Sequence, residues 1–183
     1  TTAPELPATT LADYCYYYMF KGCTSLTTAP ELPATTLADY CYQDMFSDCT
    51  SLTTASELPV TTLVEGCYMD MFSGCTSLTT APELPAMELK DFCYCGMFYG
   101  CSSLITAPEL PATILAKGCY SWMFSGCTAL TSITVEATTP PTLGTNAFDK
   151  TNNCPIYVPA ESVEAYKTAS RWSALASRIQ AIP

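Results

Sequence analysis

Cysteine is the most reactive residue type in this chain, and its spacing is regular. Of the 12 cysteines, ten recur at intervals of 26 residues in two sets. The two sets are Cys15, Cys41, Cys67, Cys93 and Cys119, and Cys23, Cys49, Cys75, Cys101 and Cys127. If successive units stack, neighbours in a set lie about 5 Å apart, within reach of a disulfide, but five members cannot all pair. We therefore expect two structural columns of buried, reduced thiols.

Cysteines at this spacing have three other possible roles: disulfides, a zinc site and a nucleophilic thiol. Partial disulfide formation remains an alternative for the columns. Zinc binding is poorly supported, because the chain has no C-x-x-C pair and Cys93-Tyr94-Cys95 is an unfavourable ligand spacing. No basic residue is placed to lower the pKa of a cysteine, so a nucleophilic thiol is not expected either.

Carboxylates form a second kind of column. The acidic column consists of Glu5, Glu31, Glu57, Glu83 and Glu109, and a further line runs through Asp13, Asp39, Glu65 and Asp91 to Lys117. Unit charges about 5 Å apart in water repel by roughly 0.8 kcal/mol, which solvated side chains tolerate. We expect a solvated surface that resists aggregation, with a Ca²⁺-binding surface as the alternative. A glycosidase would need one distinguished pair of carboxylates, and none stands out.

Aromatic residues supply the third candidate site. A tyrosine follows each cysteine of the first set, and Trp122 lies close to the last of them. The candidate binding stripe is Tyr16, Tyr42, Tyr68, Tyr94, Tyr120 and Trp122. Such rings either pack on neighbouring units or present a contact surface to a protein or a sugar. The pairs beside the tyrosines vary from unit to unit, which favours this side for specificity: residues 17–18, 43–44, 69–70, 95–96 and 121–122.

Composition excludes several classes of function. The chain has 183 residues, no His, and 17 Asp and Glu against 7 Lys and Arg, a net charge of −10. The absence of His excludes imidazole metal sites and Ser/His or Cys/His catalysis, and the acidity argues against nucleic acid as a partner. No apolar run reaches the roughly 18 residues of a membrane span. We expect no enzyme activity, no metal and no cofactor.

The elements that position these residues repeat with them. Five copies of a 26-residue unit, T-x-A-P-E-L-P-A-T-x-L-x-x-x-C-Y-x-x-M-F-x-G-C-x-x-L, occupy residues 1–130 without an insertion. A period of this length predicts a solenoid whose units bury their apolar sides by stacking. The spacing of Leu11, Cys15 and Met19 by four predicts a helical side. Residues 23–29 are expected to form a short strand that the following prolines end.

The unit resembles a known family. The segment Met19-Phe20-Lys21-Gly22-Cys23-Thr24-Ser25-Leu26 is similar to the A-F-x-x-C-x-x-L pattern of BspA-like leucine-rich repeats. Residues 156–167 are similar to the segment that commonly closes such arrays. The unit is longer than usual, and Met stands where Ala is commoner. The resemblance implies a bacterial secreted or cell-surface protein, often adhesin-like, and brings no catalytic residues.

Residues 131–183 leave the 26-residue period and predict a degenerate sixth repeat with a C-terminal helical cap. Residues 133–135 and 154–158 are predicted strands. Val163, Tyr166, Trp172, Leu175, Ile179 and Ile182 recur at helical spacing. A cap covers the core that the last unit of a solenoid would otherwise expose.

Taken together, we expect an α/β repeat solenoid: a right-handed leucine-rich-repeat-like array of short strands and helical turns with a helix in its C-terminal cap. The expected function is adhesion or protein binding by a bacterial cell-surface or secreted monomer. We expect the ligand to be an unidentified protein or glycan, which a host could supply, and we expect no insertion of the chain into a membrane. A structural spacer for another domain and a glycan-binding module are the alternatives. Residues 1–4 match residues 27–30, so we expect the signal segment to be absent from this sequence.

Overall fold

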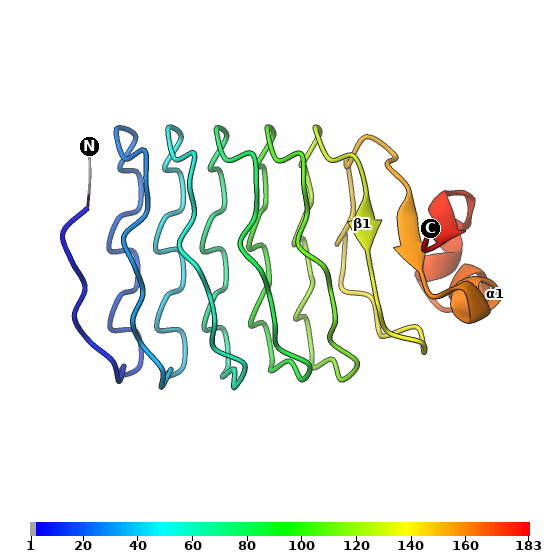
Figure 1. Ribbon diagram of the computed structural model, residues 1–183, viewed down its shortest axis with the longest axis horizontal. Helices are drawn as coiled ribbons and strands as arrows, with labels where there is room; N and C mark the ends of the chain where they lie inside the picture. Colours follow the sequence, from blue (N-terminus) through cyan, green and yellow to red (C-terminus); the bar gives the residue numbers. More distant parts are fainter. Residues whose placement is uncertain (1–2) are drawn as a thin grey trace.

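Successive coils of the chain lie side by side along one long axis in the computed structural model, which describes residues 3–183. The first coil, drawn in blue, lies at one end of the stack and the helices lie at the other (Figure 1). Thr1 and Thr2, the expected start of the first repeat, lie outside the described residues. Backbone hydrogen bonds join each coil to the next: Tyr16 donates to the carbonyl of Cys41 at 3.0 Å, and Phe20 donates to Met45 at 2.9 Å.

The predicted helical side of each coil is wrong. Residues 13–22, 39–48, 65–74, 91–100 and 117–126 form consecutive turns, which we call the turn segments. Alternate N–H groups donate three residues back, as Cys15 does to Ala12 and Tyr17 does to Tyr14, both at 3.2 Å. The N–H groups between them donate to the next coil. An α-helix would use all of these donors within its own segment.

Every fourth residue of a turn segment has a left-handed backbone. In the first coil these are Tyr14, Tyr18 and Gly22, with φ of 56°, 59° and 71°. The chain therefore reverses its local direction at each fourth residue, and side chains alternate as two inward and two outward. Cys41, Tyr42, Met45 and Phe46 are all buried, whereas Gln43 between the pairs is half-buried. Apolar residues at every fourth position are therefore compatible with both a helix and this ladder of turns.

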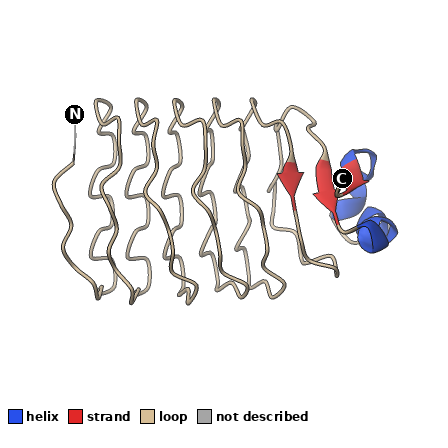
Figure 2. Cartoon of the chain, in the orientation of Figure 1, coloured by secondary structure: helices blue, strands red, loops and turns tan. Residues whose placement is uncertain are grey.

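The opposite side of each coil is extended, but it does not form the continuous strands expected over residues 23–29. The coils meet there in isolated parallel bridges, among them Thr28 with Thr54 and Thr80 with Thr106. Pro30 and Pro33 follow in the next stretch, and proline has no N–H with which to extend a ladder. Figure 2 accordingly draws most of the repeats as loop.

The C-terminal segment contains all helices and named strands of the part described. Strand β1 (Ile133–Thr134) and strand β2 (Ile156–Val158) lie within the two predicted strands. They are followed by the 3₁₀-helix η1 (Ala160–Ser162), helix α1 (Val163–Thr168), the 3₁₀-helix η2 (Trp172–Arg178) and strand β3 (Ile179–Ala181). The predicted helical pattern is therefore wrong at Ile179, which lies in a strand.

The cap continues the stack rather than ending it abruptly. The three strands form a parallel sheet in the order β1-β2-β3, with Ile133 opposite Ile156 and Ile156 opposite Ile179. The column of Phe rings likewise extends from Phe124 to Phe148 at 6.2 Å and on to Trp172 at 5.8 Å between ring centroids. The shortened final coils thus cover the core of the last full repeat, while α1 and η2 occupy the outer end.

The left-handed positions give a direct test of the turn ladder. Gly66 and Gly100 both have positive φ, at 55° and 71°. A Cβ at Gly66 would lie 2.3 Å from the Tyr40 ring, whereas one at Gly100 would meet nothing within 4 Å. We expect Gly66→Ala to lower the free energy of unfolding by about 1–3 kcal/mol more than Gly100→Ala, because Tyr40 must leave its place. Urea denaturation measures both.

A double variant separates this contact from backbone strain. Tyr40→Ala removes the ring, so Gly66→Ala in that background should cost no more than Gly100→Ala does. Equal losses for the two glycine variants in the original chain would contradict the overlying ring as the cause.

Candidate functional site

The two cysteine columns lie in the interior of the stack. Cys41, Cys67, Cys93 and Cys119 are buried, as are Cys49, Cys75, Cys101 and Cys127. In the second column each buried thiol donates to a main-chain carbonyl of the preceding coil, as Cys49 does to Phe20 at 3.0 Å and Cys101 does to Phe72 at 3.1 Å. Each of these carbonyls also accepts a backbone N–H of its own coil, as Phe20 does from Cys23 at 3.0 Å, so the thiol adds a second donor that joins neighbouring coils.

Burial also makes these thiols unreactive. It raises the pKa of the Cys41 thiol to about 11 and that of the Cys49 thiol to about 11, and it raises the pKa of Cys67 and Cys101 well above the usual range. Since the thiolate is the reactive form, these groups stay neutral at physiological pH. All twelve cysteines are free, and only Cys15 and Cys23 are exposed.

Thiol titration tests this arrangement. We expect two cysteines of the native protein, Cys15 and Cys23, to react quickly with an aromatic disulfide reagent, and the ten buried ones to react only after denaturation. The double variant Cys15→Ser/Cys23→Ser should show no fast phase. A fast phase that persists in this variant would mean that the interior columns open readily.

The tyrosine column was expected as a candidate binding stripe, but most of its side chains are buried in the core. Tyr42, Tyr68, Tyr94 and Tyr120 are 1%, 2%, 2% and 3% exposed. Their rings stack from coil to coil, with centroids 5.7 Å apart between Tyr16 and Tyr42 and 5.8 Å apart between Tyr42 and Tyr68. Because inward residues come in pairs, the tyrosine after each cysteine enters the core beside it. Only half-buried Tyr16 and exposed Trp122 keep access to solvent.

One hydroxyl in this column lacks a partner. The Tyr42 hydroxyl is buried and makes no hydrogen bond within residues 3–183, whereas the Tyr166 hydroxyl donates to the carbonyl of Ala137 at 2.7 Å. We expect Tyr42→Phe to leave the free energy of unfolding unchanged or to raise it by about 1 kcal/mol, because it removes an unsatisfied group. The matched Tyr166→Phe should lower it by about 1 kcal/mol. Thermal melts of both variants check this, and a clear loss in Tyr42→Phe would contradict it.

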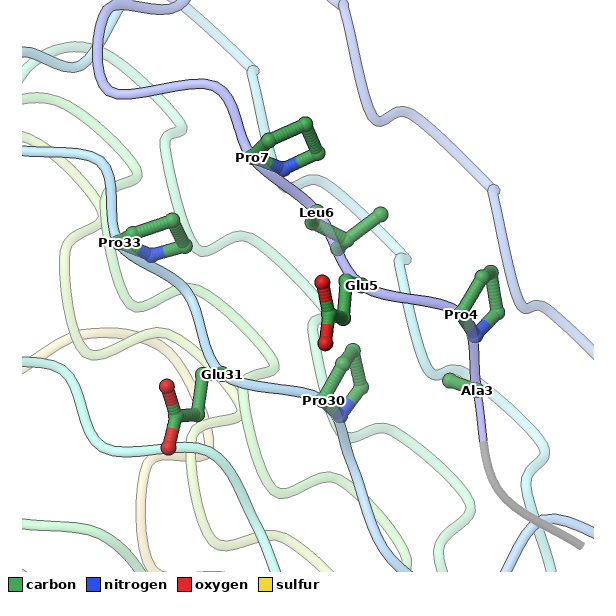
Figure 3. A pocket seen from close by; sticks show the side chains of 8 residues that line it. All are labelled: Ala3, Pro4, Glu5, Leu6, Pro7, Pro30, Glu31 and Pro33. Carbon is green, nitrogen blue, oxygen red and sulfur yellow. The ribbon is translucent and has the colours of Figure 1, made fainter.

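The acidic column lies on the surface. Glu5, Glu31, Glu57, Glu83 and Glu109 are all exposed. Figure 3 shows the first two side chains projecting in the same direction from adjacent coils, beside the prolines that flank each of them. Among residues 3–183, no three His, Cys, Asp or Glu side chains come together as a set that could hold a metal ion.

The second acidic line has a structural use. Asp13 Oδ1 accepts the N–H of Asp39 at 3.2 Å, and Asp39 Oδ1 accepts the N–H of Glu65 at 3.1 Å. Asp91 Oδ1 accepts the N–H of Lys117 in the same way, at 3.1 Å. Each carboxylate thus satisfies a backbone donor where the next turn segment begins. Lys117 replaces an acidic residue at the end of this line, but the hydrogen bond is kept because Lys117 contributes only its backbone N–H.

The outward residues of the turn segments differ in chemistry from coil to coil, and we call this surface the turn face. It comprises the five variable pairs at 17–18, 43–44, 69–70, 95–96 and 121–122 together with Lys21, Ser73 and Tyr99. At one end the Lys21 ammonium lies 2.9 Å from Asp44 Oδ1 and 4.4 Å from the centroid of the Tyr18 ring. At the other end Tyr99 and Trp122 are 49% and 43% exposed.

A cavity of about 490 Å³ opens on the turn face, and we call it the Asp70 pocket. It is lined by Met69, Asp70, Ser73, Cys95, Gly96, Tyr99 and Trp122. Burial and the nearby Asp44 carboxylate raise the pKa of Asp70 to about 6, against an opposing effect of Lys21. The sequence pointed to this side through its variable pairs, but it did not bring residues of three coils together. A signal was present in the sequence, because Asp70, Gly96 and Trp122 occupy equivalent positions of successive repeats, as do Ser73 and Tyr99.

Comparison with known proteins adds a family. The model for the BspA type leucine rich repeat region matches six copies, over residues 8–97 and 94–170. No curated protein matches the chain. The family is typically associated with cell surfaces and implies a repeat solenoid. Across residues 3–183, no helix has the length and apolar character needed to cross a bilayer. On the strength of these repeats, the chain belongs to the BspA-type leucine-rich repeat family.

Proposed function

We propose that this chain is a non-catalytic cell-surface or secreted module that binds other proteins, in adhesion or a related contact, through its turn face. The family in general points to protein–protein interaction at surfaces. The observation that supports the proposal most directly is the turn face itself. It exposes Tyr99 and Trp122 in the lining of the Asp70 pocket, whereas most rings of the stacked Tyr and Phe columns are buried. Exposed aromatic rings beside a cavity are typical of energetically important binding residues.

The chemistry of the side chains supports the proposed non-catalytic character. Cys95 and Ser73 are the nucleophilic residue types that line the pocket, and burial raises the pKa of the Cys95 thiol to about 11, with a further contribution from Asp70. A thiol that stays neutral at physiological pH is a poor nucleophile, because the thiolate is the reactive form. With no His in the chain, no general base of that kind can assist.

A structural spacer is the alternative, and the surface weighs against it. The continuous hydrogen bonding between coils would suit a spacer, but a spacer has no use for a surface that changes from coil to coil. Tyr18, Asp44, Asp70, Gly96 and Trp122 occupy equivalent positions along one line of the turn face and differ in charge and size. We propose in addition that the array winds to the right, acts as a monomer, binds neither nucleic acid nor the membrane interior, and meets a protein that could come from a host.

An array of immobilised extracellular proteins and glycans tests the proposed function. We expect the chain to bind proteins, and the double variant Tyr99→Ser/Trp122→Ser to lose most of that signal, because both rings are exposed and contribute contact area. The control is Thr79→Ser/Thr80→Ser, which alters exposed residues on the extended side. Signals that survive the turn-face variant, or that appear only on glycans, would contradict the proposal.

A further inference from the structure

The Asp70 pocket contains the Asp70 carboxylate, and the absence of a side chain at Gly96 leaves room for it. A Cβ at Gly96 would lie 2.0 Å from Asp70 Oδ1, so any other residue at that position would displace the carboxylate. Met69 and Ser73 of the same coil as Asp70, and Tyr99 and Trp122 of the next two coils, border the space.

The carboxylate of Asp70 has no partner of its own. Within residues 3–183 it makes no ion pair and no hydrogen bond, although it is half-buried. Burying a charge without pairing it is costly, and its pKa of about 6 reflects that cost. At neutral pH the pocket therefore presents an unpaired negative charge.

The same column shows how such a carboxylate is satisfied one coil earlier. Asp44, the residue equivalent to Asp70, accepts the Lys21 ammonium at 2.9 Å, and that ammonium lies against the Tyr18 ring. Lys21 lies in the coil before Asp44, and the equivalent residue in the coil before Asp70 is Ser47. The Ser47 side chain carries no charge and is too short to pair with Asp70. The chain thus supplies a cation to Asp44 and none to Asp70.

We propose that the Asp70 pocket binds a lysine or arginine side chain of a partner protein, with the cation at Asp70 and its alkyl stem against Trp122 and Tyr99. This inference rests on the proposed protein-binding function and names the chemistry of the contact. Rings of Trp and Tyr attract cations through their faces. The net charge of −10 draws basic partners toward the chain, which increases the rate of association.

The binding experiment uses a short Gly/Ser peptide with one central Lys, its Arg counterpart and its acetyl-lysine counterpart, each titrated into the full chain by calorimetry. We expect the Lys and Arg peptides to bind and the acetyl-lysine peptide to bind at least tenfold more weakly, because it lacks the charge. Asp70→Asn should weaken binding of the Lys peptide about tenfold. Glu57→Gln removes the same charge from the exposed acidic column and should change binding less than twofold.

We expect acidic pH to weaken peptide binding by protonating Asp70. Binding of the Lys peptide is expected to fall as the pH drops through about 6, where Asp70 takes up its proton. The charged groups that influence the pKa of Asp70 are Asp44, which raises it, and Lys21, which lowers it, and the neutral Cys95 thiol shares the pocket lining. The Asp70→Asn variant should show no such fall between pH 7.5 and pH 5.

Two readouts keep the inference separate from folding and from the proposed function. Asp70→Asn should raise the melting temperature at pH 7.5 and lose this gain below about pH 4, since an elevated pKa in the folded state makes ionisation destabilising. Equal losses of binding in Asp70→Asn and Glu57→Gln, or equal binding of the acetyl-lysine peptide, overturn the inference. If the peptides fail while array signals still depend on Tyr99 and Trp122, the basic ligand is wrong and the proposed function stands.

Discussion

The hydrogen bonding of the turn segments between coils is the constraint on which the rest of the structure depends. Alternate N–H groups close turns within a segment, and those between them donate to the next coil. This division requires a left-handed residue at every fourth position, so side chains leave the backbone as pairs, two inward and two outward. Half of the backbone N–H groups of a turn segment find no acceptor within their own coil. Stacking therefore buries the apolar core and also supplies these acceptors.

The paired alternation explains which residues the interior selects. Cysteine is small enough for a column and can donate its S–H to the carbonyl of a Phe in the previous coil, as Cys75 does to Phe46. The larger partners, Tyr, Met and Phe, then stack on their equivalents. The aromatic columns consequently contribute to the stability of the array and are withdrawn from binding, which leaves the outward pairs free to vary.

The proposed function uses positions outside the stacked columns of Cys, Tyr, Met and Phe. Outward residues of a turn segment differ between coils, and some of them are exposed, such as Tyr99 and Trp122, whereas others are buried, such as Asp44 and Cys95. The Asp70 pocket gathers such residues from three adjacent coils. Its unpaired carboxylate departs from the surrounding pattern, in which Asp13 and Asp39 serve backbone donors and Asp44 pairs with Lys21. We propose that a contact with a partner protein accounts for that departure.

The sequence by itself determined the 26-residue repeat, its family, the stacking of like residues and the two predicted strands that contain β1 and β2, because periodicity and composition are read directly from the residues. It could not choose between a helix and a ladder of turns, since Leu11, Cys15 and Met19 have the same spacing in both. Only the tertiary structure decided that Tyr42 and Tyr68 are buried and that Asp70, Gly96 and Trp122 share a cavity. The physical reason is that inward and outward directions depend on where each backbone N–H finds its acceptor, and half of those acceptors lie in another coil.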